Sequence, residues 1–287
     1  MSRRPAPPLA VVCWPFEHGS PDVGMGLGAS ALAEDEALHD ELAAAGWSPT
    51  VERIAAADPA AGEVTRIFDL LRAQAAAVNG AVRRGAFPVV LAGGCISASG
   101  TVAGAAGGGR VGAVWLDAHA DLDTPEDNLS GSMDVMALAI LTGTAWQASA
   151  RTIPGFAPVA QRDVALLGVR DLAPYQHDAL AASAIRTAPG TIADDPMWPV
   201  AALPDHVYLH VDLDVLDTSV GQANRHAAPG GPSLERVLEA VDATFDHATV
   251  IAAALTAYEP RSDRPGSIRA AARTIAGQIA ARALAQR

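Results

Sequence analysis

The 287-residue sequence contains no lysine, only two cysteines and no long apolar run. Without lysine, and with a formal net charge of −12, the chain has no basic stripe that could neutralise a phosphate backbone, so we expect no nucleic-acid partner. Cys13 and Cys95 are too few for a disulfide framework, which favours a reducing, cytoplasmic setting. No stretch approaches the roughly 20 apolar residues that span a bilayer, so we expect no membrane partner either.

Strand-like and helix-like segments alternate along the chain. Half of the residues are hydrophobic and 18% are charged, which is enough apolar surface for a substantial core. Continuous apolar runs separated by Ala-rich amphipathic segments are typical of a parallel sheet that helices cover on both faces. The predicted strands are residues 9–14, 87–93, 111–117, 163–169, 206–214 and 249–256. The predicted helices are residues 31–45, 62–84, 132–142, 233–245 and 266–286. With no internal repeat and no linker, we predict a single α/β domain over residues 1–287, three-layered α/β/α with a mostly parallel sheet.

Alternating acidic and imidazole side chains follow two of the predicted strands, in VWLDAHADLD (114–123) and HVDLDVLD (210–217). Side chains at alternate strand positions point to one face, and parallel strands end at one edge of the sheet. Clustered buried carboxylates need a cation, and carboxylates with an imidazole suit divalent ions such as Mn²⁺. A lone D-x-D pair is often only a turn, but two such segments together favour a metal site. The candidate ligands here are Asp117, His119, Asp121, Asp212 and Asp214.

Three segments resemble signatures of the ureohydrolases, the arginase and agmatinase superfamily. DAHADLDTPEDNLSG (117–131) is similar to the family's D-A-H-x-D-x-N-T-P…S-G, and HVDLDVLDTS (210–219) to its S-x-D-x-D-x-x-D-P segment. APGGPS (228–233) is similar to the Gly-Gly turn that follows. The resemblance implies an arginase-like α/β/α fold, a binuclear manganese site, hydrolysis of a C–N bond in linear amidines, and a homo-oligomer, commonly a trimer or hexamer.

The resemblance also implies a division of the ligands between two manganese ions. Asp117 and Asp212 would bridge the ions. His119 and Asp214 would complete the shell of one ion, and Asp121 would belong to the other.

One ligand position departs from the family pattern. VVLAGGCISASG (89–100) is similar to a strand end that reads G-G-D-H-S in the family, with Gly94 in the place of the Asp and Cys95 in the place of a metal-binding His. A thiolate favours zinc or iron over manganese, so we expect the ion near Asp121 to be weakly held, or to be Fe or Zn. The alternative, that Cys95 is only a small buried residue, stays open.

The expected catalytic positions depart as well. Asp134 stands where many members have a His proposed as a proton shuttle, so it is a candidate for acid–base work, or alternatively a cap of the following helix. Asp123 replaces the family's Asn at a substrate-contact position and would favour a cationic group nearby. Ser130 matches the family's Ser and is a substrate-binding candidate.

The place of the acid that binds guanidinium in arginases is taken by Ala257. Glu259, two residues further along, either faces the cleft and substitutes for it or is a surface acid. Loss of the anchor removes a charge-assisted pair worth roughly 1.5–3 kcal/mol, which argues against free arginine as substrate. His226 is a further substrate-contact candidate, and His210, on the strand of the second D-x-D pair, could support the ligands.

We therefore expect a metal-dependent hydrolase of a guanidino-type or amide-type C–N bond, acting on a small-molecule or peptide substrate such as a modified or peptide-bound arginine. The alternative is a catalytically silent ureohydrolase-like protein with a ligand-binding or structural role, suggested by Cys95, Asp134 and Ala257. The remaining carboxylate and His ligands favour retained metal binding. A phosphate-ester hydrolase is less favoured, because no anion-cradling Arg accompanies the motifs.

Overall fold

The computed structural model describes residues 6–192 and 200–287. An eight-stranded sheet with the order β4-β1-β5-β10-β9-β6-β7-β8 runs through this part of the chain, and all its pairings are parallel. Its strands are β1 (Pro8–Trp14), β4 (Ser48–Arg53), β5 (Phe87–Ala92), β6 (Gly112–Leu116), β7 (Val164–Leu167), β8 (Arg186–Ala188), β9 (His206–Asp212) and β10 (Thr249–Thr256). A short antiparallel pair, β2 (Phe16–Glu17) and β3 (Ser20–Pro21), follows β1.

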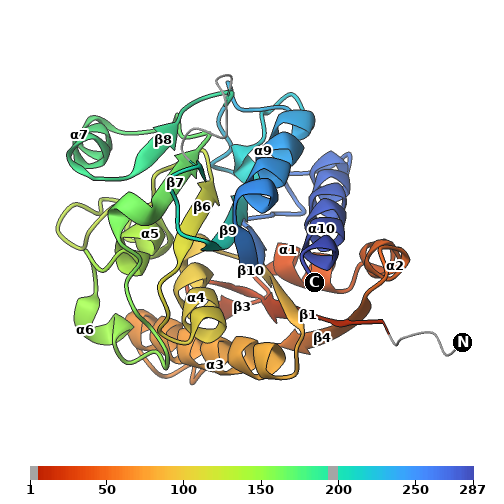
Figure 1. The fold of residues 1–287 in the computed structure, drawn as a ribbon. Helices are drawn as coiled ribbons and strands as arrows, with labels where there is room; N and C mark the ends of the chain where they lie inside the picture. The colour runs from red at the N-terminus through yellow and green to blue at the C-terminus, as the bar shows by residue number, and fades with distance from the viewer. Residues whose placement is uncertain (1–5, 193–199) are drawn as a thin grey trace, which may run out of the picture.

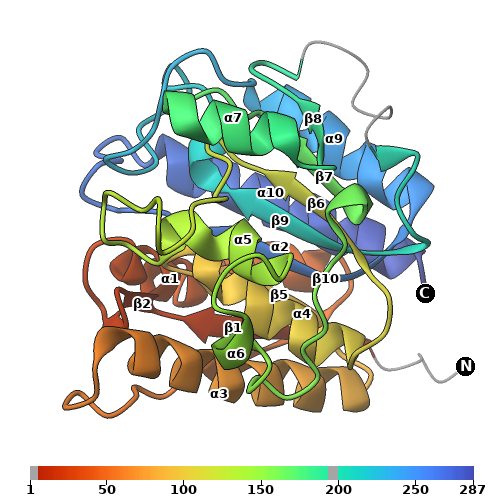
Figure 2. The ribbon, with the colours of Figure 1, turned by 90° about the vertical axis from the view of Figure 1, so that its left-hand side faces the viewer.

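Helices cover both faces of the sheet (Figure 1). The α-helices are α1 (Gly26–Ala33), α2 (Glu36–Ala44), α3 (Glu63–Arg83), α4 (Ala98–Ala106), α5 (Ala137–Leu141), α6 (Gln147–Ala150), α7 (Pro174–Ala182), α9 (Leu234–His247) and α10 (Ser267–Ala285). Single 3-10 turns are η1 (Cys95–Ser97), η2 (Asp134–Met136), η3 (Gln161–Asp163) and η4 (Leu213–Val215). One core lies between the sheet and α1, α2, α9 and α10, and another between the sheet and α3, α4 and α5. Figure 2 shows α3 and α4 in one layer, beside β1 and β5.

Alternation along β1 shows how the sequence builds these layers. Leu9 and Val11 belong to the first core, whereas Val12 and Trp14 belong to the second. Side chains of a strand point alternately to its two faces, so an uninterrupted apolar run buries both. The predicted three-layer α/β/α class with a parallel sheet is confirmed.

The structure also corrects parts of the sequence-based prediction. The edge strands β4 and β8 were not predicted; β4 is largely exposed, so it lacks the apolar run that marks the central strands. The helix predicted over residues 31–45 is two helices, because the Asp35 side chain accepts a hydrogen bond from the Ala37 N–H and starts α2. Helix α4 was missed as well. The single-domain boundary over residues 1–287 stays a prediction.

The strand order brings together four chain segments that contain predicted site positions. β5, β10, β9 and β6 are consecutive in the sheet, and all run in the same direction. Cys95 follows β5, Asp117 follows β6, Asp212 ends β9, and Ala257 follows β10. Their side chains therefore gather at one edge of the sheet, where ligand sites of α/β folds form. Of the helices in the described part of the chain, none is both long and apolar enough to cross a membrane.

Candidate metal centre

Two groups of metal-ligating side chains lie at this edge, and they share one carboxylate. Asp117, His119 and Asp214 have ligand atoms within 4.8 Å of one another; we call them the His119 group. Cys95, Asp117 and His210 meet the same criterion; we call them the Cys95 group. Of the sequence-predicted ligands, Asp117, His119 and Asp214 are thus brought together, and Asp117 also lies in one group with Cys95.

In the His119 group the carboxylates are held by backbone donors. The Asp117 Oδ1 atom accepts the N–H of His119 at 2.7 Å and lies 3.3 Å from the His119 ring Nδ1, while Asp214 Oδ2 lies 3.6 Å from the same nitrogen. Burial alone would lower the pKa of His119, but the carboxylates of Asp214 and Asp117 raise it to about 10. The imidazole therefore carries the positive charge that these acids need when no cation is bound.

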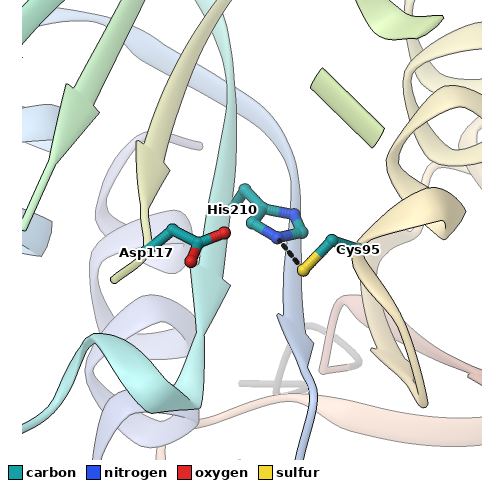
Figure 3. Close-up of side chains that lie close together, drawn as sticks. All are labelled: Cys95, Asp117 and His210. Carbon is teal, nitrogen blue, oxygen red and sulfur yellow. Dashed lines mark hydrogen bonds between the residues drawn. The ribbon is translucent and has the colours of Figure 1, made fainter. Parts of the chain in front are cut away.

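The Cys95 group is buried. The Cys95 thiol donates to Asp212 Oδ2 at 2.9 Å and lies 3.3 Å from both the Nε2 atom of His210 and the Oγ1 atom of Thr256. Figure 3 shows His210 between Asp117 and Cys95, with its Nε2 atom directed at the sulfur. Burial, with the nearby Asp212, raises the pKa of Cys95 well above its usual range, so the group is a thiol when no cation is bound.

His210 is held from two sides. Its ring stacks on the Trp115 ring, with centroids 3.7 Å apart and planes 13° apart, and its Nδ1 atom is hydrogen-bonded to the Tyr208 hydroxyl at 2.8 Å. Burial lowers the pKa of His210 to about 3, so the ring is neutral at neutral pH. The same Trp115 donates its ring N–H to Asp117 Oδ2 at 2.9 Å. The sequence prediction placed His210 as support for the ligands; the structure places it against Cys95 itself.

Asp121 has the clearest deficit of partners. Its Oδ2 atom is buried and has no hydrogen-bond partner in residues 6–192 and 200–287, and the residue adopts a left-handed backbone with φ of 51°. The N–H groups of Leu138 and Ala139 both donate to the Asp121 carbonyl at 3.0 Å, which ties the loop to the start of α5. Burial, with Asp117 nearby, raises the pKa of Asp121 well above normal. A buried acceptor without a partner costs about 1–3 kcal/mol, so the site favours a bound cation.

Burial also raises the pKa of the shared carboxyl of Asp117 and of the neighbouring Asp212. For Asp117 burial is the largest cause, and for Asp212 burial is followed by the neighbouring Asp214. Asp212 is held in place because its Oδ1 atom accepts the N–H of Asp214 at 2.8 Å. Crowded carboxyls raise one another's pKa values, and a divalent cation would relieve this repulsion and bind the unpaired oxygen of Asp121. The residues therefore fit the divalent metals that the sequence pattern predicts.

A cavity of about 240 Å³ opens onto both groups. Its lining includes the predicted Cys95, Asp121, Asp212 and Asp214, the predicted substrate-contact candidates Ser130 and His226, and Asp134. It also includes residues that the sequence prediction did not select: His18, Met25, Ser132, Val135, Asn224 and Arg225. Ala257, in the place of the family's guanidinium-binding acid, is part of the lining and has a φ of 62°.

Asp134 is half-buried beside Gly94. Its Oδ1 atom accepts the N–H of Ile96 at 3.0 Å, so it caps η1 in the way that a side chain at residue 94 itself would. A Cβ atom at Gly94 would lie 2.2 Å from Asp134 Oδ2, so only glycine leaves room for this carboxylate. Burial raises the pKa of Asp134 to about 6. The predicted cap of the following helix is not what the structure shows, since the carboxylate caps a turn on another segment.

Three predicted site residues do not line the cavity: Asp117, which lies beneath it in both groups, and the two substrate-side candidates Asp123 and Glu259. Asp123 is buried, and its carboxylate accepts hydrogen bonds from the Tyr175 hydroxyl at 3.0 Å and the Gln176 side chain at 2.7 Å. Glu259 accepts a hydrogen bond from the Ser262 hydroxyl at 3.0 Å. Asp123 therefore fastens α7 to the loop that follows β6, and Glu259 fastens the loop that follows β10.

Asn224 is a supporting residue that the sequence prediction missed. Its buried amide donates to Asp214 Oδ2 at 3.1 Å and to the Ala257 carbonyl at 2.8 Å, and its Oδ1 atom accepts the His226 N–H at 2.7 Å. It therefore connects the His119 group to the loop that carries His226. A lone Asn in a long loop has no spacing signal, so only the folded structure reveals this role.

Comparison with known proteins gives consistent matches. The family model described as "Arginase family" matches residues 8–281. An arginase of Bacillus caldovelox is 30% identical over 232 residues, which cover 74% of this chain and 77% of that protein. An arginase of Agrobacterium fabrum is 30% identical over 194 residues, covering 62% of this chain and 59% of that protein.

Solved structures share the fold. The B. caldovelox arginase superposes with a TM-score of 0.84 at 24% identity, covering 95% of this chain and 98% of that one. A putative agmatinase from Clostridium difficile gives 0.73 at 17% identity, with 99% of each chain covered.

Proposed function

The chain belongs to the arginase family, and from that premise we propose that it hydrolyses a guanidino-type or amide-type C–N bond with two divalent metal ions. The single observation that carries this is the convergence of the His119 group and the Cys95 group on the shared carboxylate of Asp117. In the proposed site Asp117 and Asp212 would contact both ions. His119 and Asp214 would complete the ligands of one ion, and Asp121 and Cys95 those of the other.

Bound divalent ions would neutralise the carboxylates and supply the Lewis-acid charge that activates water and polarises a trigonal carbon. Family resemblance favours manganese, and Cys95 favours zinc or iron at its own position. The orphaned Asp121 Oδ2 atom supports the assignment of a cation, because it is buried with no other partner.

We assign proton transfer to Asp134. It lines the cavity, and its pKa of about 6 lets it accept a proton at neutral pH and return it to a leaving amine. The N–H of Ile96 holds one carboxylate oxygen, which leaves the other, Oδ2, as the atom that carries the proton. Ser130 and His226, both exposed in the cavity lining, are the proposed substrate contacts.

Substrate preference follows from what lines the cavity around Ala257. The other carboxylates in the lining are the proposed ligands and Asp134, and apolar surface comes from Met25, Val135 and Ala257. A free guanidinium therefore has no dedicated carboxylate partner here, and we propose a substituted guanidine, a peptide-bound arginine or an amide as substrate. Homo-oligomerisation, as a trimer or hexamer, stays a prediction for light scattering to test.

The test is a substrate panel on protein loaded with manganese and zinc, alone and together. Urea or amine release from a substituted guanidine, a peptide-bound arginine or an amide, absent in the Asp117→Asn variant, supports the proposal. Full metal loading with no turnover of any guanidine or amide contradicts it and supports the alternative of a silent, ligand-binding member of the family.

A further inference from the structure

We propose that His210 is itself a metal ligand, and that Cys95, His210, Asp212 and Asp117 form a buried nitrogen, sulfur and oxygen set that takes zinc. This inference rests on the proposed binuclear site and assigns one of its two positions a ligand and a metal of its own. It makes the chain a mixed-metal protein, with zinc at the Cys95 group and manganese at the His119 group.

The separations between ligand atoms are those of a zinc shell. A tetrahedral zinc ion, with bonds of about 2.3 Å to sulfur and 2.0 Å to nitrogen, holds the two atoms about 3.5 Å apart. Here the Cys95 Sγ atom and the His210 Nε2 atom are 3.3 Å apart, and Asp117 completes a set with all ligand atoms within 4.8 Å. Asp212 Oδ2 lies 2.9 Å from the sulfur. In a tetrahedral shell the sulfur and a carboxylate oxygen lie about 3.5 Å apart, so Cys95 and Asp212 would separate by roughly half an ångström as the ion binds.

His210 is oriented as metal-binding imidazoles are. Such a ring usually has its second nitrogen hydrogen-bonded, which fixes the tautomer and aims the first. The Tyr208 hydroxyl lies 2.8 Å from Nδ1, and Trp115 stacks on the ring, so Nε2 stays directed at Cys95. Trp115 also donates to Asp117 Oδ2, so one side chain orients two of the proposed ligands.

An exchange of residue types between two strands accompanies this geometry. In the signatures that the chain resembles, the His belongs to the segment after β5 and a Ser to the β9 segment. This chain has Cys95 at the first place and His210 at the second. Compared with those signatures, the imidazole lies on β9 instead of after β5. A thiol stands after β5, where the signature has its His. The replacement shifts the donor set from one that suits manganese to one that suits zinc.

The charges of the buried ligands also favour a zinc ion at the Cys95 group. When Zn²⁺ binds, the thiol releases its proton to solvent and the sulfur forms the bond to zinc. The resulting thiolate, with the carboxylates of Asp117 and Asp212, then neutralises the ion. Asp121 keeps its proposed place as a further oxygen ligand of this ion, since its Oδ2 atom has no hydrogen-bond partner among the described residues and it lines the same cavity.

The test is metal binding by purified protein stripped with a chelator and kept reduced. Zn²⁺ and Mn²⁺ affinities are measured by titration calorimetry, and Co²⁺ is added as a spectroscopic probe whose thiolate charge-transfer band reports the Cys95 sulfur. The variants are His210→Ser, Cys95→Ser and the double exchange Cys95→His/His210→Ser. The control is His206→Ala, an exposed His at the start of the same strand.

The wild type and the control should each bind one Zn²⁺ at least 100-fold more tightly than Mn²⁺ at this position. His210→Ser should weaken that zinc at least 100-fold and shift the Co²⁺ spectrum, and Cys95→Ser should abolish the charge-transfer band. The double exchange should lower the ratio of Zn²⁺ to Mn²⁺ affinity at this position at least 10-fold. Unchanged zinc affinity in a folded His210→Ser variant would overturn the inference. If that variant does not fold, a double exchange with an unchanged ratio of Zn²⁺ to Mn²⁺ affinity overturns it instead.

The outcome is separable from that of the proposed function. Zinc held through His210 without any C–N bond hydrolysis would leave this inference standing and sink the proposed reaction. Hydrolysis by a His210→Ser variant that keeps its zinc would do the reverse.

Discussion

His119 keeps 27% of its side chain exposed at the cavity, and backbone N–H groups hold the carboxylates around it. Cys95 and His210, by contrast, are buried, and the Trp115 ring and the Tyr208 hydroxyl hold His210 against the thiol. The two groups nevertheless share Asp117 and the same sheet edge. The difference teaches that a parallel sheet fixes where ligands converge, while the residue types on neighbouring strands decide which metal each position selects. Five predictions break or sharpen this comparison, from the largest effect to the smallest.

Asp117→Asn should remove both metals, because its carboxylate belongs to both groups. We expect each affinity to fall at least 1000-fold and hydrolysis to fall below detection, measured by elemental analysis and product release. Asp163→Asn is the matched control, since it removes a buried carboxylate that is paired with Arg110 away from the cavity. Two metal equivalents retained in the Asp117 variant would contradict the shared role.

His119→Ala should remove one metal only. We expect manganese affinity at the His119 group to fall about 100-fold, while zinc at the Cys95 group changes less than threefold. The reason is that the carboxylates nearest the His119 ring are those of Asp117, Asp214 and Asp171, and the ring belongs to the His119 group and not to the Cys95 group. Competitive titration with both metals measures the two affinities, and equal loss of both would show that the groups are not separable.

Asn224→Ala should also lower the manganese affinity of the His119 group, by less than His119→Ala does. Its amide orients Asp214, and loss of such an outer partner typically costs 10–100-fold in metal affinity. Calorimetry with Mn²⁺ should show this loss, with Zn²⁺ binding unchanged. A zinc affinity that falls in parallel would mean that Asn224 holds the whole edge together rather than the His119 group.

Asp134→Asn should lower the rate of hydrolysis about tenfold at neutral pH. It should also remove the fall in rate on the acidic side of the pH–rate profile. Burial raises the pKa of Asp134 to about 6, so below that pH the folded protein holds the carboxyl protonated and unable to accept a proton. Wild-type activity should therefore rise with pH through about 6, and the Asn variant should stay flat over that range. Metal content is measured at each pH as the control. If the rate of the Asn variant still falls below about pH 6, Asp134 is not the group whose protonation causes the fall.

Glu259→Gln should change activity and both metal affinities less than twofold. Its side chain accepts a hydrogen bond from Ser262 and does not line the cavity, so we expect no contact with a guanidinium. Steady-state kinetics with a guanidine and an amide measure this. A selective rise in KM for the guanidine would instead place Glu259 in the substrate site.

Much of this arrangement is predictable from the sequence because strand periodicity is local. Alternation placed Asp117 and His119 on one edge, and Asp212 and Asp214 on the same one, and the parallel fold class followed from the apolar runs. The edge strands escaped prediction, because β4 is exposed along most of its length.

The parts that escaped prediction depend on contacts between segments far apart in sequence. Nothing local says that Asp134 fills the space beside Gly94, or that Asn224 ties Asp214 to the Ala257 carbonyl. The sequence likewise placed Asp123 near substrate, whereas Tyr175 and Gln176 take up its oxygens in the structure. Alternation put His210 on the ligand side of its strand, but only the sheet order brings it to Cys95.

The central claim is that the two groups select different metals, and anomalous diffraction tests it most directly. Crystals of the protein loaded with one equivalent of Zn²⁺ and one of Mn²⁺ would be measured at the absorption edges of both elements. We predict a zinc peak between Cys95 and His210 and a manganese peak between His119 and Asp214. The same metal at both positions, or no peak beside Cys95, would contradict the account.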